Sequence, residues 1–241
     1  MYVLASNPIF NAYQGSDLFG KFIFLALLLL SVMTWVIFLQ KFFLQQDVKR
    51  RGAQLALAFK KKKLNPLGLE VGEALHPYAA MYRTLKEHTV ELLQKNRAVL
   101  QKNEVTISHT DIALLEAHLM SAISSETQSM EKNLFVLSTV VSLAPFLGLL
   151  GTVWGILLTF AELQTGASVN ASGAIMGGLA MALGTTVMGL LVAIPALIGY
   201  NYLKATIAHF SADMENFSHL LLASVELQYR QVDINTNYEN A

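Results

Sequence analysis

The chain has no cysteine among its 241 residues, and charged residues make up only 14% of it. Without cysteine it can form neither a disulfide framework nor a thiolate metal site. Charge is scarcest in one long stretch, because Glu162 is the only ionised side chain between Lys132 and Lys204. With 54% hydrophobic residues and a mean hydropathy of +0.44, the chain is too apolar for an ordinary soluble domain. We therefore predict an all-α integral membrane protein.

Further absences argue against several classes of function. The apolar runs contain no Asp and no His, and the chain has no HExxH motif, so we expect no enzyme, no metal and no cofactor. A solute transporter is disfavoured because the sequence shows no internal repeat and no interrupted helix pair. The first 20 residues carry one charge, Asp17, and no basic start. They do not resemble a cleaved secretory signal, and we expect them to be retained.

Three apolar runs are long enough to cross a bilayer, which takes about 20 residues. We predict membrane helices over 21–40, 134–161 and 174–203. Fourteen of the seventeen Lys and Arg residues lie between Lys41 and Lys132. The positive-inside rule places this basic, helical loop (41–133) in the cytoplasm. The N-terminal segment (1–20) and a short loop (162–173) are then external, and the C-terminal helix and tail (204–241) are cytoplasmic.

The basic loop carries its own signals. The lysine run at 60–63 suits contact with anionic lipid headgroups, which we favour over nucleic acid in a chain anchored by membrane helices. Breaks at 65–68 and at His76-Pro77 divide the loop into short helices. Ser108 to Asp111 reads as a capping box. No breaker follows it, so we expect one long helix that continues into the second span.

The chain after Leu203 repeats apolar residues at helical spacing. This pattern predicts an amphipathic helix that continues the third span and packs on the helix beginning near Asp111. The last dozen residues are expected to fray. The seam consists of Ile207, Phe210, Met214, Phe217, Leu221 and Val225.

Small and hydroxylated residues align on one face of each central span. At a spacing of three and four, one face of the second span holds Ser138, Ser142, Pro145, Leu149, Thr152, Ile156 and Thr159. The third span has a small-residue stripe made of Gly178, Ala182, Thr185, Gly189, Ala193 and Ala196. Such residues allow close helix packing, and the hydroxyls either face a partner or pore or bond their own helix.

Two sequence stretches closely resemble the TolQ/ExbB proton-channel subunits of the MotA/TolQ/ExbB family. The stretch 144–156, APFLGLLGTVWGI, resembles their second-span signature. The stretch GLAMAL at 178–183, followed by Thr186, Gly189 and AIPA at 193–196, resembles their third span. The resemblance implies a homopentamer around a central pore in the bacterial inner membrane. The pore would hold the single spans of a TolR/ExbD-type partner with a protonatable aspartate, and a TolA/TonB-type subunit is a further expected partner.

The resemblance also implies roles for individual residues. By position, Thr152 and Thr186 match the pore threonines that face the partner's aspartate, and we expect Thr185, Ser142 and Ser138 along the same path. The residues expected to pack helices are Pro145, Gly148, Gly151, Gly155, Gly178, Gly189 and Pro195.

One position departs from the family pattern. The family usually has a glutamate five residues before the third-span threonine, and here that residue is Met181. A proton relay in this chain would then use hydroxyls, water and the partner's carboxylate. A membrane scaffold that positions a partner without conducting protons is the alternative.

Two physiological roles follow within the family. The short segment before the first span favours a TolQ-like subunit, which serves cell division and envelope integrity in a Tol-Pal system. The alternative is an ExbB-like subunit that energises nutrient uptake across the outer membrane. A flagellar stator is less favoured, because those subunits have four spans.

Overall fold

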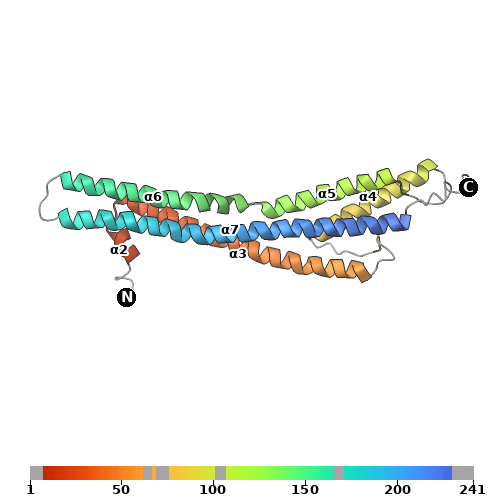
Figure 1. Ribbon diagram of the computed structural model, residues 1–241, viewed down its shortest axis with the longest axis horizontal. Coiled ribbons are helices and arrows are strands. Elements are labelled where there is room, and N and C mark those ends of the chain that lie inside the picture. The colour runs from red at the N-terminus through yellow and green to blue at the C-terminus, as the bar shows by residue number, and fades with distance from the viewer. Residues whose placement is uncertain (1–7, 62–66, 69–75, 101–106, 165–170, 230–241) are drawn as a thin grey trace, which may run out of the picture. The chain divides into compact units, whose positions relative to one another are not determined.

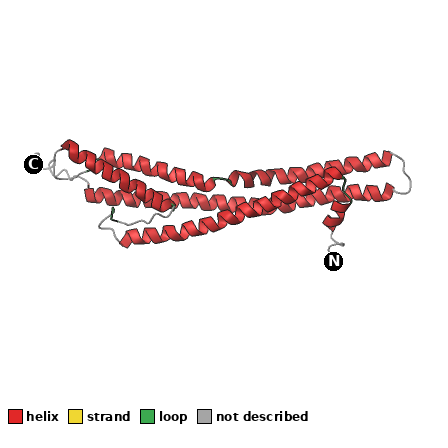
Figure 2. Ribbon diagram, turned by 180° about the vertical axis from the view of Figure 1, so that it is seen from behind, coloured by secondary structure: helices red, strands yellow, loops and turns green. Residues whose placement is uncertain are grey.

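The computed structural model describes residues 8–61, 67–68, 76–100, 107–164 and 171–229 (Figure 1). Nearly all of these residues are helical (Figure 2), which confirms the predicted all-α class. The helices are α2 (Pro8–Gln14), α3 (Leu18–Lys61), α4 (Pro77–Leu100), α5 (His109–Glu131), α6 (Leu134–Gln164) and α7 (Ala171–Tyr229).

Among the described residues, three helices are long and apolar enough to cross a membrane, as the sequence predicted. The candidate spans are Leu18–Gly52, Leu134–Gln164 and Ile175–Tyr229. The 44 residues of α3 and the 59 residues of α7 extend about 66 and 88 Å at a rise of about 1.5 Å per residue. The hydrocarbon core of a bilayer is only about 30 Å thick. The expected boundaries at residues 40 and 203 are therefore changes of composition inside continuous helices.

The chain divides into two compact units. Unit 1 comprises residues 1–42 and 133–204, and unit 2 comprises residues 43–132 and 205–241. The apolar core of unit 1 draws side chains from three helices, so α3, α6 and α7 are held together by burial of aliphatic groups. The core residues are Ile23 and Leu27 from α3, Val140 and Ala144 from α6, and Val192, Ala193 and Ala196 from α7.

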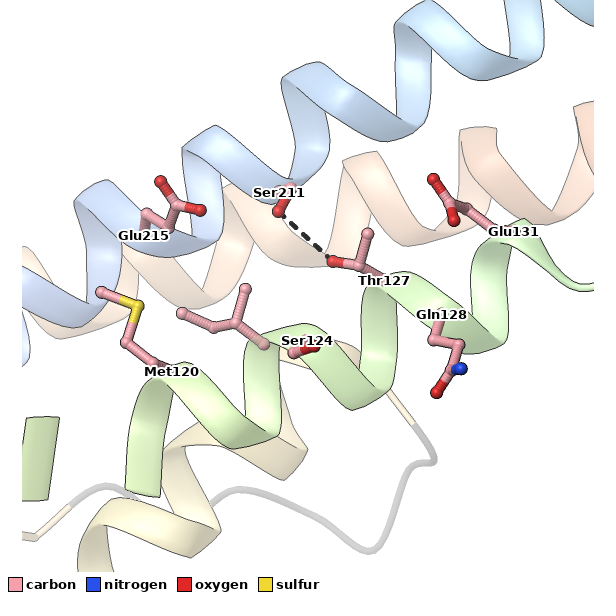
Figure 3. Close-up of a pocket in the computed structure, with 8 residues that line it drawn as sticks. Met120, Ser124, Thr127, Gln128, Glu131, Ser211 and Glu215 are labelled. Carbon is pink, nitrogen blue, oxygen red and sulfur yellow. Dashed lines mark hydrogen bonds between the residues drawn. The ribbon is translucent and has the colours of Figure 1, made fainter. Parts of the chain in front are cut away.

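In unit 2 the C-terminal part of α7 packs on α5, as predicted. All six residues of the seam that begins at Ile207 are buried, and α5 buries Leu115, Leu119 and Ile123 against its neighbours. The Thr127 hydroxyl of α5 donates to the Ser211 hydroxyl of α7 across 3.3 Å. This bond lies in an open polar groove of about 420 Å³ (Figure 3). The groove is lined by Met120, Ile123, Ser124, Thr127, Gln128, Glu131, Ser211 and Glu215.

An aromatic cluster around Tyr78 of α4 also holds unit 2 together. Its ring meets Phe210 and Phe217 of α7 at centroid distances of 5.4 and 5.6 Å. Gly52 of α3 leaves room for this ring, since a Cβ there would lie 2.7 Å from Tyr78 Cδ2. Burial, together with the nearby carboxylate of Asp213, raises the pKa of Tyr78 to about 12.

The predicted capping box at the start of α5 is confirmed, but the expected unbroken helix beyond it is wrong. The Ser108 N–H donates to Asp111 Oδ2 at 3.0 Å, and the Ser108 hydroxyl accepts from the Thr110 N–H. The helix ends at Glu131 and α6 starts at Leu134, because Asn133 adopts a positive φ of 72°. Asparagine tolerates this left-handed conformation better than other side chains do, and it ends a helix without Gly or Pro.

One further prediction on the basic loop is confirmed, and the others concern residues that the structure describes only in part or not at all. The break at His76-Pro77 is confirmed, because α4 begins at Pro77. The break expected at 65–68 falls mostly outside the described residues. The side chains of 60–63 and the residues 230–241 also lie outside that part of the chain.

Candidate functional site

A seam of glycines brings α6 and α7 into close contact in unit 1. Gly148, Gly151 and Gly155 of α6 are buried, as are Gly178 and Gly189 of α7. A Cβ on Gly155 would lie 2.6 Å from the Gly178 carbonyl oxygen, and one on Gly189 would lie 2.7 Å from the Ala144 carbonyl oxygen. No side chain fits at these positions without moving the other helix. The two prolines lie inside α6 and α7 without ending either helix, Pro145 half-buried and Pro195 exposed.

This close approach lets hydroxyls of one helix reach backbone carbonyls of the other. The Thr152 hydroxyl lies 3.1 Å from its own helix's Gly148 carbonyl oxygen and 3.1 Å from the Ala182 carbonyl oxygen of α7. The Thr186 hydroxyl lies 3.3 Å from each of the same two carbonyl oxygens. The two hydroxyls also bond one another.

The threonine pair is rich in acceptors. Four oxygens meet there, but only two hydroxyl protons are available to bond them. The spare lone pairs can accept from water or from a protonated group. Both side chains are half-buried, so such a donor can reach them from the surface of the single chain.

The pair lies on the side of the α6–α7 seam away from α2 and α3. Trp154 is two residues beyond Thr152 on α6, which is about 200° around a helix. Trp154 packs against a cluster formed by Ala12 of α2, Phe24 of α3 and Met181 of α7. Helices α2 and α3 therefore cover one side of the α6–α7 pair, and the hydroxyls lie on the other.

The other predicted path residues differ in how far the structure exposes them. Ser138 is half-buried and Ser142 is exposed, with the Ser142 hydroxyl 3.4 Å from the Ser138 carbonyl oxygen. Thr185 is fully buried in the seam opposite Gly151, and its hydroxyl bonds the Met181 carbonyl oxygen of its own helix at 3.0 Å. In the single chain Thr185 is a packing residue. Thr159 is likewise buried and bonds the Gly155 carbonyl oxygen at 2.8 Å.

Met181, at the position where the resembling family usually has glutamate, is fully buried. Its neighbours are Ala12 and Phe24, and its sulfur would lie 2.6 Å from a Cβ placed on Gly20. Five residues separate it from Thr186, so it points about 140° away around α7. A thioether suits this closed apolar cluster because it fills space without needing a hydrogen bond.

Sequence reasoning missed a carboxylate at the depth of the threonine pair. Asp17 caps α3, and its side chain accepts from the Gly20 N–H at 2.9 Å and from Trp154 Nε1 at 3.0 Å. Trp154 lies ten residues before the end of α6 at Gln164, or about 15 Å along the helix. An Asp just before an apolar helix is a capping signal, but the pairing with Trp154 spans 137 residues and leaves no local pattern.

Comparisons with known proteins identify the family of the chain. The model of the MotA/TolQ/ExbB proton channel family matches residues 79–216, more than half of the chain. The chain is 28% identical to the biopolymer transport protein ExbB of Salmonella typhimurium over 232 residues, which are 95% of this chain and 89% of that protein. It is 28% identical to ExbB of Pseudomonas putida over 221 residues, 90% of this chain and 64% of that protein.

The chain is also similar to a protein with the TolQ name. The Tol-Pal system protein TolQ of Haemophilus influenzae is 40% identical over 96 residues, which are 40% of this chain and 42% of that protein. The family match covers parts of both units and includes the entire glycine seam and both threonines of the pair. The chain therefore belongs to the MotA/TolQ/ExbB proton channel family.

Proposed function

We propose that this chain is the proton-channel, or stator, subunit of a motor in the bacterial inner membrane that uses proton flow to energise the outer envelope. The observation that carries the proposal is the acceptor-rich pair Thr152–Thr186, half-buried on the side of the α6–α7 seam that α2 and α3 leave open. A lone hydroxyl bonded to its own helix would point to packing. Two hydroxyls that share two carbonyls across helices favour a polar path.

In a homopentamer the open sides of five α6–α7 pairs would surround a central pore. Each copy would contribute one threonine pair to a ring of hydroxyls at one depth. A TolR/ExbD-type partner span inside the ring would bring its aspartate against those hydroxyls. A carboxyl group in a low-dielectric pore is costly unless hydroxyls or water solvate it, so the ring lowers the cost of both of its charge states.

The distribution of charged side chains in this chain supports a proton-carrying group on the partner. Between Glu162 and Lys204 the sequence has no Asp, Glu, His, Lys or Arg, and the Asp17 carboxylate is bonded to Gly20 and Trp154 on the covered side. The partner would therefore supply the proton-carrying group, and this chain would supply the polar wall. Met181 does not take part, because its thioether is enclosed among Ala12 and Phe24. Conduction therefore does not require a glutamate at this position.

The distribution of basic residues supports an orientation. With fourteen of seventeen Lys and Arg between Lys41 and Lys132, unit 2 lies in the cytoplasm. The N-terminus and the loop between α6 and α7 then face the periplasm. The partner's periplasmic part, with a TolA/TonB-type subunit, would carry the work to the outer envelope.

The experiment is proton flux into liposomes that contain the purified chain with and without a single-span partner. The proposal predicts that flux requires the partner and a proton gradient. If an intact complex carries no protons under any gradient, the chain is a scaffold and the proton-channel proposal is wrong.

A separate experiment decides whether the chain serves nutrient uptake or a Tol-Pal system. Relatives that align over 90–95% of the chain carry the ExbB name, whereas a relative with the TolQ name aligns over 40% of it at higher identity. Co-expression with an ExbD-type and a TolR-type subunit, followed by purification on a tag of this chain, decides between them. Retention of the ExbD type alone supports nutrient uptake, and retention of the TolR type alone supports the Tol-Pal role.

A further inference from the structure

Asp17 uses both of its carboxylate oxygens to join two helices. Oδ1 accepts from the Gly20 N–H in the first turn of α3, and Oδ2 accepts from the Trp154 indole N–H of α6. Hydrogen bonds to an ionised group are stronger than neutral ones, and a carboxylate is favoured at a helix N-terminus. The two bonds fix the indole relative to the start of α3.

The surroundings of this bond are apolar and closely packed. The Phe19 ring lies on Trp154 with a centroid distance of 4.6 Å. The cluster of Ala12, Phe24 and Met181 packs against the indole from α2, α3 and α7. In α2 and in residues 171–203 of α7 there is no charged side chain, and the nearest on α6 is Glu162, eight residues beyond Trp154.

The contact between α6 and α7 combines glycine packing with the hydrogen bonds of the threonine pair, which lie on one side of the seam. Three of its α6 residues are Gly148, Gly151 and Gly155, which present a smooth surface without side chains. The bond from Trp154 to Asp17 adds a directional contact on the other side of α6, so that the rotation of this helix is fixed from two sides. Because Trp154 and Thr152 lie about 200° apart on α6, rotation that moves the indole away from Asp17 also moves Thr152 relative to Thr186.

We propose that Asp17 is a positioning residue that, through Trp154, holds α6 in the rotation at which Thr152 meets Thr186. The expected effect of Asp17 on proton conduction rests on the proposed proton-channel function. The hydrogen bond between Asp17 and Trp154 does not depend on that function. The carboxylate does not touch the threonines. It acts on them through the indole and the helix.

The chain offers a direct optical readout, because it has only two tryptophans. Trp35→Phe removes the other one, which is exposed on α3, and leaves Trp154 as the sole tryptophan. In that background Asp17→Asn should change the emission maximum and the near-ultraviolet circular dichroism of Trp154, since an amide has one acceptor oxygen for two donors. Asp47→Asn, at an exposed carboxylate of unit 2 paired with Arg51, is the matched control and should change neither.

Proton flux with the partner present supplies the second readout. Asp17→Asn and Trp154→Phe should each lower flux roughly tenfold, the factor that corresponds to the loss of one charge-assisted hydrogen bond. The double variant should be no worse than either single one, because both remove the same bond. Trp154→Phe keeps an aromatic ring in the cluster, and co-elution of the partner reports whether each variant still assembles.

The two proposals fail in different ways. An unchanged Trp154 signal in Asp17→Asn, or additive losses in the double variant, overturns the positioning role. If the unaltered chain with its partner carries no protons at all, the channel proposal fails. The tryptophan signal still decides whether Asp17 positions α6 in that case.

Discussion

Gly151→Ala is the smallest change that should force α6 and α7 apart. The added Cβ would lie 2.5 Å from Thr185 Cβ and 2.8 Å from its Cγ2, about 1 Å closer than ordinary carbon contacts of about 3.5–4.0 Å. Thr185 cannot yield, because it is β-branched, fully buried and bonded to the Met181 carbonyl oxygen. The helices must therefore separate by about 1 Å, at an overpacking cost of about 1–3 kcal/mol.

The separation should also break the polar cluster. Bonds of Thr152 to the Ala182 carbonyl at 3.1 Å and of Thr186 to the Gly148 carbonyl at 3.3 Å have no slack for such a movement. We expect a lower midpoint of thermal unfolding in detergent, followed by circular dichroism, and a loss of partner-dependent proton flux.

Gly173→Ala is the matched control, because nothing lies within 4 Å of a Cβ at that position of α7. Replacing a helical glycine by alanine stabilises by about 0.5–1 kcal/mol where space permits. The two variants should therefore move stability in opposite directions. If Gly151→Ala is as stable and as active as Gly173→Ala, the close seam described here does not exist in the folded protein.

Two further predictions concern the parts of the chain outside the glycine seam. The Tyr78 phenol has a pKa raised by burial to about 12, above its ordinary value of about 10, so its stabilising effect is complete below pH 10 and is lost as pH rises to 12. Denaturant unfolding should show unit 2 losing about 2 kcal/mol over this window, a loss that Tyr78→Phe removes; an equal loss in both proteins would contradict the assignment. At the break between α5 and α6, Asn133→Ala should destabilise the fold by about 1 kcal/mol, because alanine is strained at a φ of 72°, whereas Asn133→Gly should be neutral or better. Equal unfolding free energies for the two variants would show that this conformation is not required.

Local patterns allowed much of the fold to be predicted. The helical spacing from Ile207 to Val225 gave the buried seam of α7, and the capping box at Ser108 gave the start of α5. Both signals lie within a few residues of the structure that they specify. The break at Asn133 left no such signal, because asparagine in a left-handed conformation looks in sequence like any polar residue.

The candidate site was harder to predict from the sequence. Which face of a helix points into the site depends on how that helix packs against its neighbours. Thr185 and Thr186 are adjacent and chemically identical, yet one fills the seam and the other flanks it. Thr185 lies opposite Gly151, whereas the Thr186 hydroxyl bonds the Gly148 carbonyl oxygen. The bond between Asp17 and Trp154 depends on packing between distant segments, so no spacing rule reveals it.

Partner-dependent proton flux in Thr152→Val/Thr186→Val, compared with flux in Thr139→Val, shows whether protons move along the hydroxyls of the threonine pair. Thr139 is an exposed threonine of α6 whose hydroxyl bonds only its own helix, at the Phe135 carbonyl oxygen. Valine keeps the shape of threonine and removes the hydroxyl in each case. We expect the double variant to bind its partner but to lose flux, while Thr139→Val conducts as the unaltered chain does. Normal flux in the double variant would contradict a proton path along these hydroxyls.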